Sequence, residues 1–148
     1  MFLLIVISIA GFVLSTLLHL FMLFHIYNPP RELIIFTNIG AAFVIYAAIF
    51  ISKRVCDQAN VKDFKKALYN TCPKWISALT GFLIMYAFAG LLFLIFKKYF
   101  GSPISASNED SIGGNFRGFS GHWMALYALA FSIVYSCKKY VNALKDNK

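Results

Sequence analysis

The sequence predicts an all-α membrane protein, built as one bundle of four transmembrane helices with the N- and C-termini in the cytoplasm. Three observations lead to this fold class. Hydrophobic residues make up 59% of the 148-residue chain and charged residues 14%, against roughly 25% charged residues in soluble proteins. Four long apolar segments have no charged residue in their interior. Basic residues gather beside the segment ends on one side. We therefore expect a single transmembrane domain over residues 1–148.

Each apolar segment is long enough to cross a bilayer as a helix. A hydrocarbon core about 30 Å thick needs about 20 apolar residues in helical form, and the predicted spans are residues 2–27, 33–52, 75–97 and 119–137. Lipid offers no hydrogen-bond partners to the backbone, so these segments are predicted to be helices rather than strands. The first span lacks the basic start and the cleavage site of a signal peptide, and we expect it to be retained.

The basic residues predict how the spans are oriented. Ten of the fourteen lie between the second and third spans or after the fourth: Lys53, Arg54, Lys62, Lys65, Lys66, Lys74, Lys138, Lys139, Lys145 and Lys148. By the positive-inside rule, residues 53–74 then form a cytoplasmic loop and residues 98–118 an outer loop. The net charge of +8 matches anionic lipid, so we expect no nucleic-acid partner. The arrangement indicates a multi-pass protein of the bacterial inner (cytoplasmic) membrane.

The cytoplasmic loop contains the pattern of a short amphipathic helix. Its apolar residues recur at helical spacing while its lysines face elsewhere, which is typical of a helix lying on an anionic leaflet. The alternative is a docking helix for a cytosolic partner. The residues that would contact lipid or a partner are Lys62, Phe64, Lys65, Lys66 and Leu68.

Small residues mark a face of the fourth span, at steps of four, three, four and four residues: Gly121, Ala125, Ala128, Ser132 and Ser136. Ser77 and Gly81 add a second small pair on the third span. Small residues let two transmembrane helices approach closely. The sequence leaves open whether these faces pack inside the bundle, against a second copy of the chain or against another membrane protein.

Ionisable groups are expected to gather on the outer side of the membrane. His19 and His25 lie towards the outer end of the first span, Glu32 follows it, and Arg117 and His122 flank the start of the fourth span. We interpret the histidines first as hydrogen-bonded residues near the membrane interface. Asn38 lies at membrane depth in the second span, and we expect it to bond to another helix.

A prosthetic group is the alternative interpretation of these histidines. Two histidines from separate helices can ligate the iron of haem b, and His25 with His122 are weak candidates for a metal ion. The chain has neither a CxxCH nor an HExxH motif, so the expectation is that no cofactor is bound.

The three cysteines, Cys56, Cys72 and Cys137, fall on or near the predicted cytoplasmic side, where thiols stay reduced. Their spacing does not match a zinc site. A redox pair of Cys56 with Cys72 is the alternative to three inert thiols.

The sequence predicts function only by class. A nucleophile with an adjacent base and orienting group is not evident, so we expect a protein that is not an enzyme and that acts by binding another protein or itself. Examples are an accessory subunit, an immunity-type inhibitor, or a membrane component of a defence or secretion assembly. The alternatives are an oligomeric channel or small transporter, and a haem b or metal redox protein.

Overall fold

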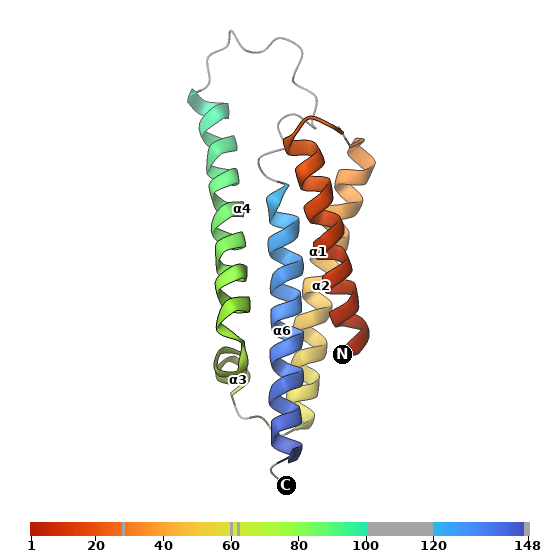
Figure 1. Cartoon of the computed structure of the whole chain (residues 1–148), viewed down its shortest axis with the longest axis vertical. Helices are drawn as coiled ribbons and strands as arrows, with labels where there is room; N and C mark the ends of the chain where they lie inside the picture. Colours follow the sequence, from red (N-terminus) through yellow and green to blue (C-terminus); the bar gives the residue numbers. More distant parts are fainter. Residues whose placement is uncertain (28, 60, 62, 101–119, 147–148) are drawn as a thin grey trace.

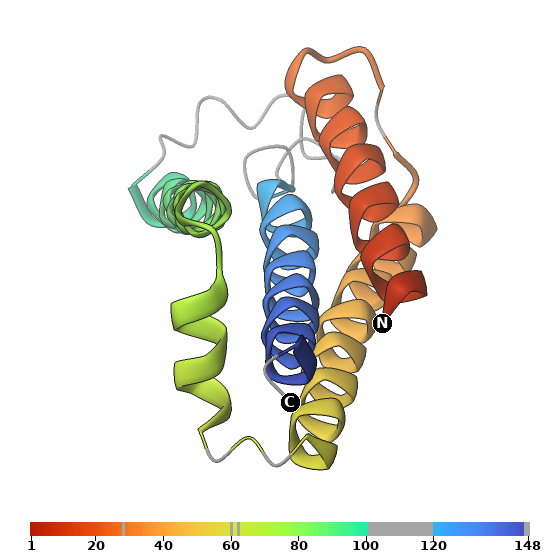
Figure 2. The same ribbon diagram turned by 60° about the horizontal axis from the view of Figure 1, so that its bottom comes forward.

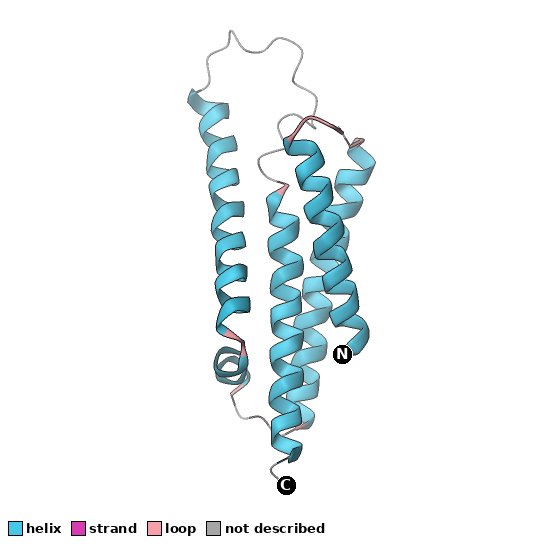
Figure 3. Cartoon of the chain, viewed as in Figure 1, coloured by secondary structure: helices cyan, strands magenta, loops and turns pink. Residues whose placement is uncertain are grey.

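The computed structural model describes residues 1–27, 29–59, 61, 63–100 and 120–146. This part of the chain is helical without strands (Figure 3). In chain order its helices are α1 (Phe2–Leu23), α2 (Arg31–Gln58), α3 (Phe64–Thr71), α4 (Lys74–Phe100) and α6 (Gly121–Asp146) (Figure 1). By length and composition, α1, α2 and α4 are apolar enough to cross a membrane. The architecture is therefore that expected of an integral membrane protein.

The central element of the bundle is α6. It packs against α1, α2 and α4, while these three contact each other much less (Figures 1 and 2). Ten residues of α6 are buried, against four of α1. A helix enclosed by three others exposes little surface to lipid, so it needs fewer large apolar side chains than its neighbours.

The outer helices expose large apolar side chains, and α1 buries mainly polar ones. On α1 the buried positions are Ser8, Ser15, His19 and Met22, which share the face turned to α6. Large apolar side chains point away from the bundle, as for Phe43 (69% exposed) and Met85 (73% exposed). Soluble proteins bury such side chains. The reversed pattern is the one that a hydrocarbon solvent favours.

The first span is shorter than predicted, because α1 ends at Leu23 rather than at residue 27. The chain then reverses through His25, whose φ of 60° is left-handed. The N–H of His25 donates to the Met22 carbonyl (3.2 Å) and that of Ile26 to the Phe21 carbonyl (2.9 Å). This pair of bonds is the Schellman motif that commonly ends helices, with histidine where glycine is usual. His25 is thus a turn residue.

The other three long helices run past the predicted spans, and α4 does so by one residue at its start and three at its end. After an extended Pro30, α2 begins at Arg31 and continues to Gln58, six residues beyond the predicted end of the second span. α6 continues to Asp146, nine residues beyond the predicted end of the fourth. The extensions of α2 and α6 lie where the chain becomes basic, so these two helices project out of the apolar region. Together with α3 they form one end of the molecule (Figure 1).

The predicted loop helix is present as α3, which lies at the lower end of α4 and beside α6 (Figures 1 and 2). Its apolar side faces the protein: Phe64 and Leu68 pack against a cluster of Cys56, Cys137 and Val141. Both residues are only partly buried there, so their contact with lipid or a partner stays a prediction. Lys65 is exposed and can make such a contact. Lys62 and the side chain of Lys66 lie outside the described residues.

A tyrosine of α6 lies where α1 and α2 leave space for it. A Cβ atom built at Gly11 of α1 would overlap the Tyr127 ring, and one built at Gly40 of α2 would be 3.6 Å from the Tyr127 hydroxyl. The ring therefore lies directly on the backbone of α1 and reaches α2. This contact requires glycine at position 11, because even a methyl group there would strike the ring.

Two cysteines meet at the end of the bundle near α3. The Sγ atoms of Cys56 on α2 and Cys137 on α6 are 2.9 Å apart, and both residues are fully buried. Cys72 lies elsewhere, with its Sγ atom 3.3 Å from the Ser132 hydroxyl. The alternative pairing of Cys56 with Cys72 is therefore wrong. The structure brings Cys56 together with Cys137 instead.

We expect mild oxidation of the purified protein with iodine to link Cys56 to Cys137 within one chain. The two thiols lose two protons and two electrons, iodine is reduced to iodide, and an S–S bond forms. Intact-mass spectrometry should show the loss of two hydrogen atoms, and peptide mapping should identify the linked pair. Cys137→Ser should abolish the cross-link, whereas Cys72→Ser should leave it. A linkage through Cys72 would contradict this packing of α2 on α6.

Candidate functional site

The polar residues at the end of the bundle away from α3 form two hydrogen-bonded groups. The first centres on His19 of α1, which is 2% exposed. Its Nδ1 atom lies 2.7 Å from the Ser120 hydroxyl, in the turn before α6, and its Nε2 atom lies 2.8 Å from the Tyr86 hydroxyl on α4. The Tyr86 and His19 rings meet edge to face, with centroids 5.5 Å apart. One side chain thus ties three elements together.

The partners of His19 suit a neutral imidazole. A neutral ring has one nitrogen that donates and one that accepts, and a hydroxyl group can do either. Ser120 and Tyr86 can therefore satisfy both nitrogens in either tautomer. Buried polar groups in lipid need such partners, because water is absent. The arrangement gives His19 a structural role between helices.

Gly121 is what allows the Tyr86 ring to reach His19. A Cβ atom built at Gly121 would lie 2.6 Å from Cε1 of Tyr86, which is closer than real contacts allow. The ring crosses the start of α6 over this glycine, and then presents its hydroxyl to His19. Gly121 therefore allows a close contact between two helices of the same chain.

The second group centres on Asn38 of α2. Its Oδ1 atom accepts hydrogen bonds from Nε2 of His122 (2.6 Å) and from the indole N–H of Trp123 (3.2 Å), both on α6. Its own amide donates to the Ile34 carbonyl at 2.7 Å. The Trp123 side chain is fully buried and packs with Met22 and Ile34. The expectation that Asn38 bonds to another helix is confirmed.

The residues expected to form one outer-side site are thus divided. His19 and His122 belong to separate groups, His25 lies in the turn after α1, and Glu32 is exposed in the first turn of α2. Arg117 lies outside the described residues. Within the described ranges, His, Cys, Asp and Glu do not form a group of three that could hold a metal ion. Binding haem b through His19 or His122 would require the imidazole to leave its present partners.

The small-residue face of α6 packs mainly within the chain. Ala125 and Ala128 belong to a buried cluster with Leu83 of α4, and Gly121 and Ser136 are also buried. Ser132 is half-buried. The pair on α4 differs, because Ser77 and Gly81 are both exposed. A Cβ atom built at Gly81 would have nothing within 4 Å.

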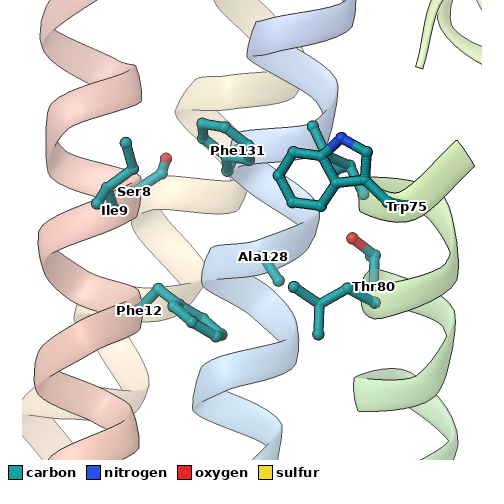
Figure 4. A pocket seen from close by; sticks show the side chains of 9 residues that line it. Ser8, Ile9, Phe12, Trp75, Thr80, Ala128 and Phe131 are labelled. Carbon is teal, nitrogen blue, oxygen red and sulfur yellow. The ribbon is translucent and has the colours of Figure 1, made fainter. Parts of the chain in front are cut away.

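A pocket of about 170 Å³ lies between α1, α4 and α6. Ala128 of α6 lies at its back, and Phe12, Phe131 and Trp75 contribute aromatic walls (Figure 4). Ser8 of α1 and Thr80 of α4 also line it, and both are buried. No local sequence pattern predicts this pocket, because its lining comes from three helices.

Comparison of the chain with protein-family models, curated proteins and solved structures finds no match. The function must therefore be argued from the arrangement of the side chains.

Proposed function

We propose that this chain is a small multi-pass protein of the bacterial inner membrane that works without catalysing a reaction, by packing against another transmembrane helix. That helix belongs either to a second copy of the chain or to a different membrane protein. In this proposal α6 is the fourth span, and both termini and α3 face the cytoplasm. The observation that carries the proposal is the exposed small pair, Ser77 and Gly81, on α4.

The surroundings of the glycines support a contact with another helix at Ser77 and Gly81. Gly11, Gly40 and Gly121 each face a tyrosine ring or hydroxyl of the chain itself, so small residues are used here for close approach. Gly81 faces open space. A small residue on a transmembrane helix has little benefit in lipid but allows a second helix to approach closely. Ser77, one turn earlier on α4, is exposed as well.

The position of α4 in the bundle supports the same proposal. It packs onto α6, and it touches α1 and α2 much less (Figure 1). Much of its surface is consequently left for contacts outside the chain. His19 and Asn38 form hydrogen bonds to side chains of other elements of the chain, as a packing role requires. A haem b protein that used His19 or His122 as a ligand would need the imidazole to leave these partners.

Basic residues support the proposed orientation. Lys53 and Arg54 are exposed near the end of α2, and the start of α4 at Lys74 is exposed at the same end of the molecule. Lys139, near the end of α6, is exposed as well. A concentration of positive charge on one side of the spans favours the cytoplasm.

We expect Gly81→Leu to weaken self-association of the chain roughly tenfold, because the larger side chain separates helices that approach closely at glycine. The measurement is single-molecule photobleaching of labelled protein in liposomes over a series of protein-to-lipid ratios. Ala89→Leu is the matched control, since Ala89 is equally exposed on α4 but points about 80° away at 100° per residue. If the chain stays monomeric at every ratio and purifies from native membranes without a stoichiometric partner, the proposal is wrong.

A further inference from the structure

An open groove runs along the junction between the first half of α1 and the second half of α6. Its volume is about 700 Å³, and its α1 wall is apolar, with Phe2, Ile5 and Ile9. The α6 wall changes character along its length. It begins with two aromatic residues and continues with polar and charged ones: Phe131, Tyr135, Lys138, Lys139, Asn142 and Asp146. The groove therefore has an apolar part and a basic end.

At its apolar part the groove meets the pocket between α1, α4 and α6. Ile9 of α1 and Phe131 of α6 line both the groove and the pocket. Beyond them, Phe12 on α1 and Ala128 on α6 belong to the pocket alone (Figure 4). The groove and the pocket together form one path, which leads from the basic end of the groove to an apolar space inside the bundle.

The length of this path matches half of a bilayer. On α6, Ala128 and Lys138 are ten residues apart, and on α1 the same separation joins Phe12 to Phe2. Ten residues of an α-helix rise about 15 Å. The hydrocarbon core of a membrane is about 30 Å thick, so one leaflet has this depth. An acyl chain that entered beside Lys138 would end in the pocket, whose accessible surface is apolar.

The charges at the basic end complement a phosphate group. The Nζ atom of Lys138 lies 5.8 Å from the centroid of the Phe2 ring, a cation–π distance that favours this position of the ammonium group over the first turn of α1. Lys139 is exposed beside it. Asp146 also lines the groove, but it lies eight residues beyond Lys138, about 12 Å farther along α6. Positive charge therefore lies next to the apolar wall, as a negatively charged lipid requires.

We propose that the groove between α1 and α6 binds a phospholipid with a negatively charged headgroup. Lys138 and Lys139 contact the phosphate, and one acyl chain follows the apolar wall past Ile9 into the pocket. The proposal rests on α1 and α6 spanning the membrane, as proposed above. It does not depend on self-association through Ser77 and Gly81, which lie on α4 and do not line the groove.

Native mass spectrometry of the full chain, titrated with lipid in mild detergent, counts the lipids bound per chain. Dioleoyl phosphatidylglycerol should bind roughly tenfold more tightly than dioleoyl phosphatidylcholine, which has the same acyl chains without net charge. Lys138→Gln with Lys139→Gln should remove this preference. Lys53→Gln with Arg54→Gln neutralises an exposed basic pair on α2, and this matched control should keep it. Equal affinities for the two lipids, or equal effects of the two double variants, would overturn the proposal.

A second variant, Ile9→Trp, tests the place of the acyl chain. Ile9 is exposed where the groove meets the pocket, so an indole there should exclude the chain and weaken phosphatidylglycerol binding roughly tenfold. Ile7→Trp is the matched control, because Ile7 is also exposed on α1 but points about 160° away at 100° per residue. This variant should bind the lipid as the unmodified chain does.

Three further results would overturn the proposal. Competition by glycerol phosphate, which has no acyl chain, would show that the lysines bind any phosphate. Lipid binding that Ile9→Trp leaves unchanged would place the chain elsewhere. A change of oligomeric state in Ile9→Trp, with lipid binding intact, would show that a helix of a second copy occupies the groove. Gly81→Leu should not alter the lipid count on the monomer, so a failure of self-association is recognised separately.

Discussion

Replacing His19 by leucine is expected to lower the free energy of unfolding by about 2 kcal/mol. Leucine has a similar volume but leaves the hydroxyls of Ser120 and Tyr86 without the ring nitrogens that they contact at 2.7 and 2.8 Å. Since His19 joins α1, α4 and the start of α6, the loss affects three elements at once. The measurement is thermal or denaturant unfolding in mild detergent, followed by circular dichroism.

A double-mutant cycle with Tyr86→Phe tests the hydrogen bond itself. Tyr86→Phe removes one hydroxyl and keeps the ring that crosses Gly121. If His19 and Tyr86 interact as the structure shows, the two substitutions together should cost less than the sum of the single effects. The expected difference is about 0.6 kcal/mol and at most about 1.7 kcal/mol, the range measured for such bonds in membranes. Additive effects would contradict the contact.

Replacing Gly11 by valine is expected to destabilise the bundle by about 1–3 kcal/mol. A Cβ atom at this position would overlap the Tyr127 ring, and valine adds two more carbon atoms. The ring cannot easily turn away, because it also lies close to Gly40 of α2. Either α1 or the ring must move, and both changes reduce packing around α6. Unfolding in mild detergent gives the measurement.

Two variants test whether the clash with the Tyr127 ring is what makes Gly11→Val destabilising. Ala10→Val introduces the same β-branched side chain at the preceding, exposed position of α1, so it should cost little. In a Tyr127→Ala background, Gly11→Val should lose most of its penalty, since the ring that valine would strike is gone. An equal penalty with and without the Tyr127 ring would show that the close approach of α1 to α6 is not as described.

The destabilisation expected for His19→Leu and that expected for Gly11→Val both follow from the central position of α6. α1 and α4 are held mainly through this helix rather than through each other. A substitution that separates one outer helix from α6 therefore cannot be compensated by contacts among the outer helices. This explains why a single glycine or histidine on a peripheral helix is expected to have a large effect.

Local sequence patterns were sufficient to predict some contacts of the candidate site. A lone amide in an apolar run, Asn38, predicted an interhelical bond, because an unpaired amide in lipid is costly. Small residues at helical spacing predicted the close-packing face around Ala125 and Ala128. Both predictions depend on residues within one helix, so the sequence contains the signal.

Other parts of the site depend on which helices are neighbours. Tyr86 was missed because a tyrosine in an apolar run looks like any interface aromatic until His19 is seen opposite it. The alternative pairing of Cys56 with Cys72 was wrong for the same reason, since proximity along the chain does not predict that Cys56 meets Cys137. The packing of Phe64 and Leu68 beside the end of α6 could not be predicted either, because it depends on which helix lies next to α3.

The sequence by itself determined that the chain is helical and apolar enough for a membrane, because length, hydropathy and charge act on each segment separately. Only the tertiary structure decided that α6 is enclosed by the other helices and that His19 bonds to Tyr86 and Ser120. The pocket between α1, α4 and α6 was decided there as well. These features arise where side chains from different helices meet, and the energy of such contacts depends on the packing of all helices together.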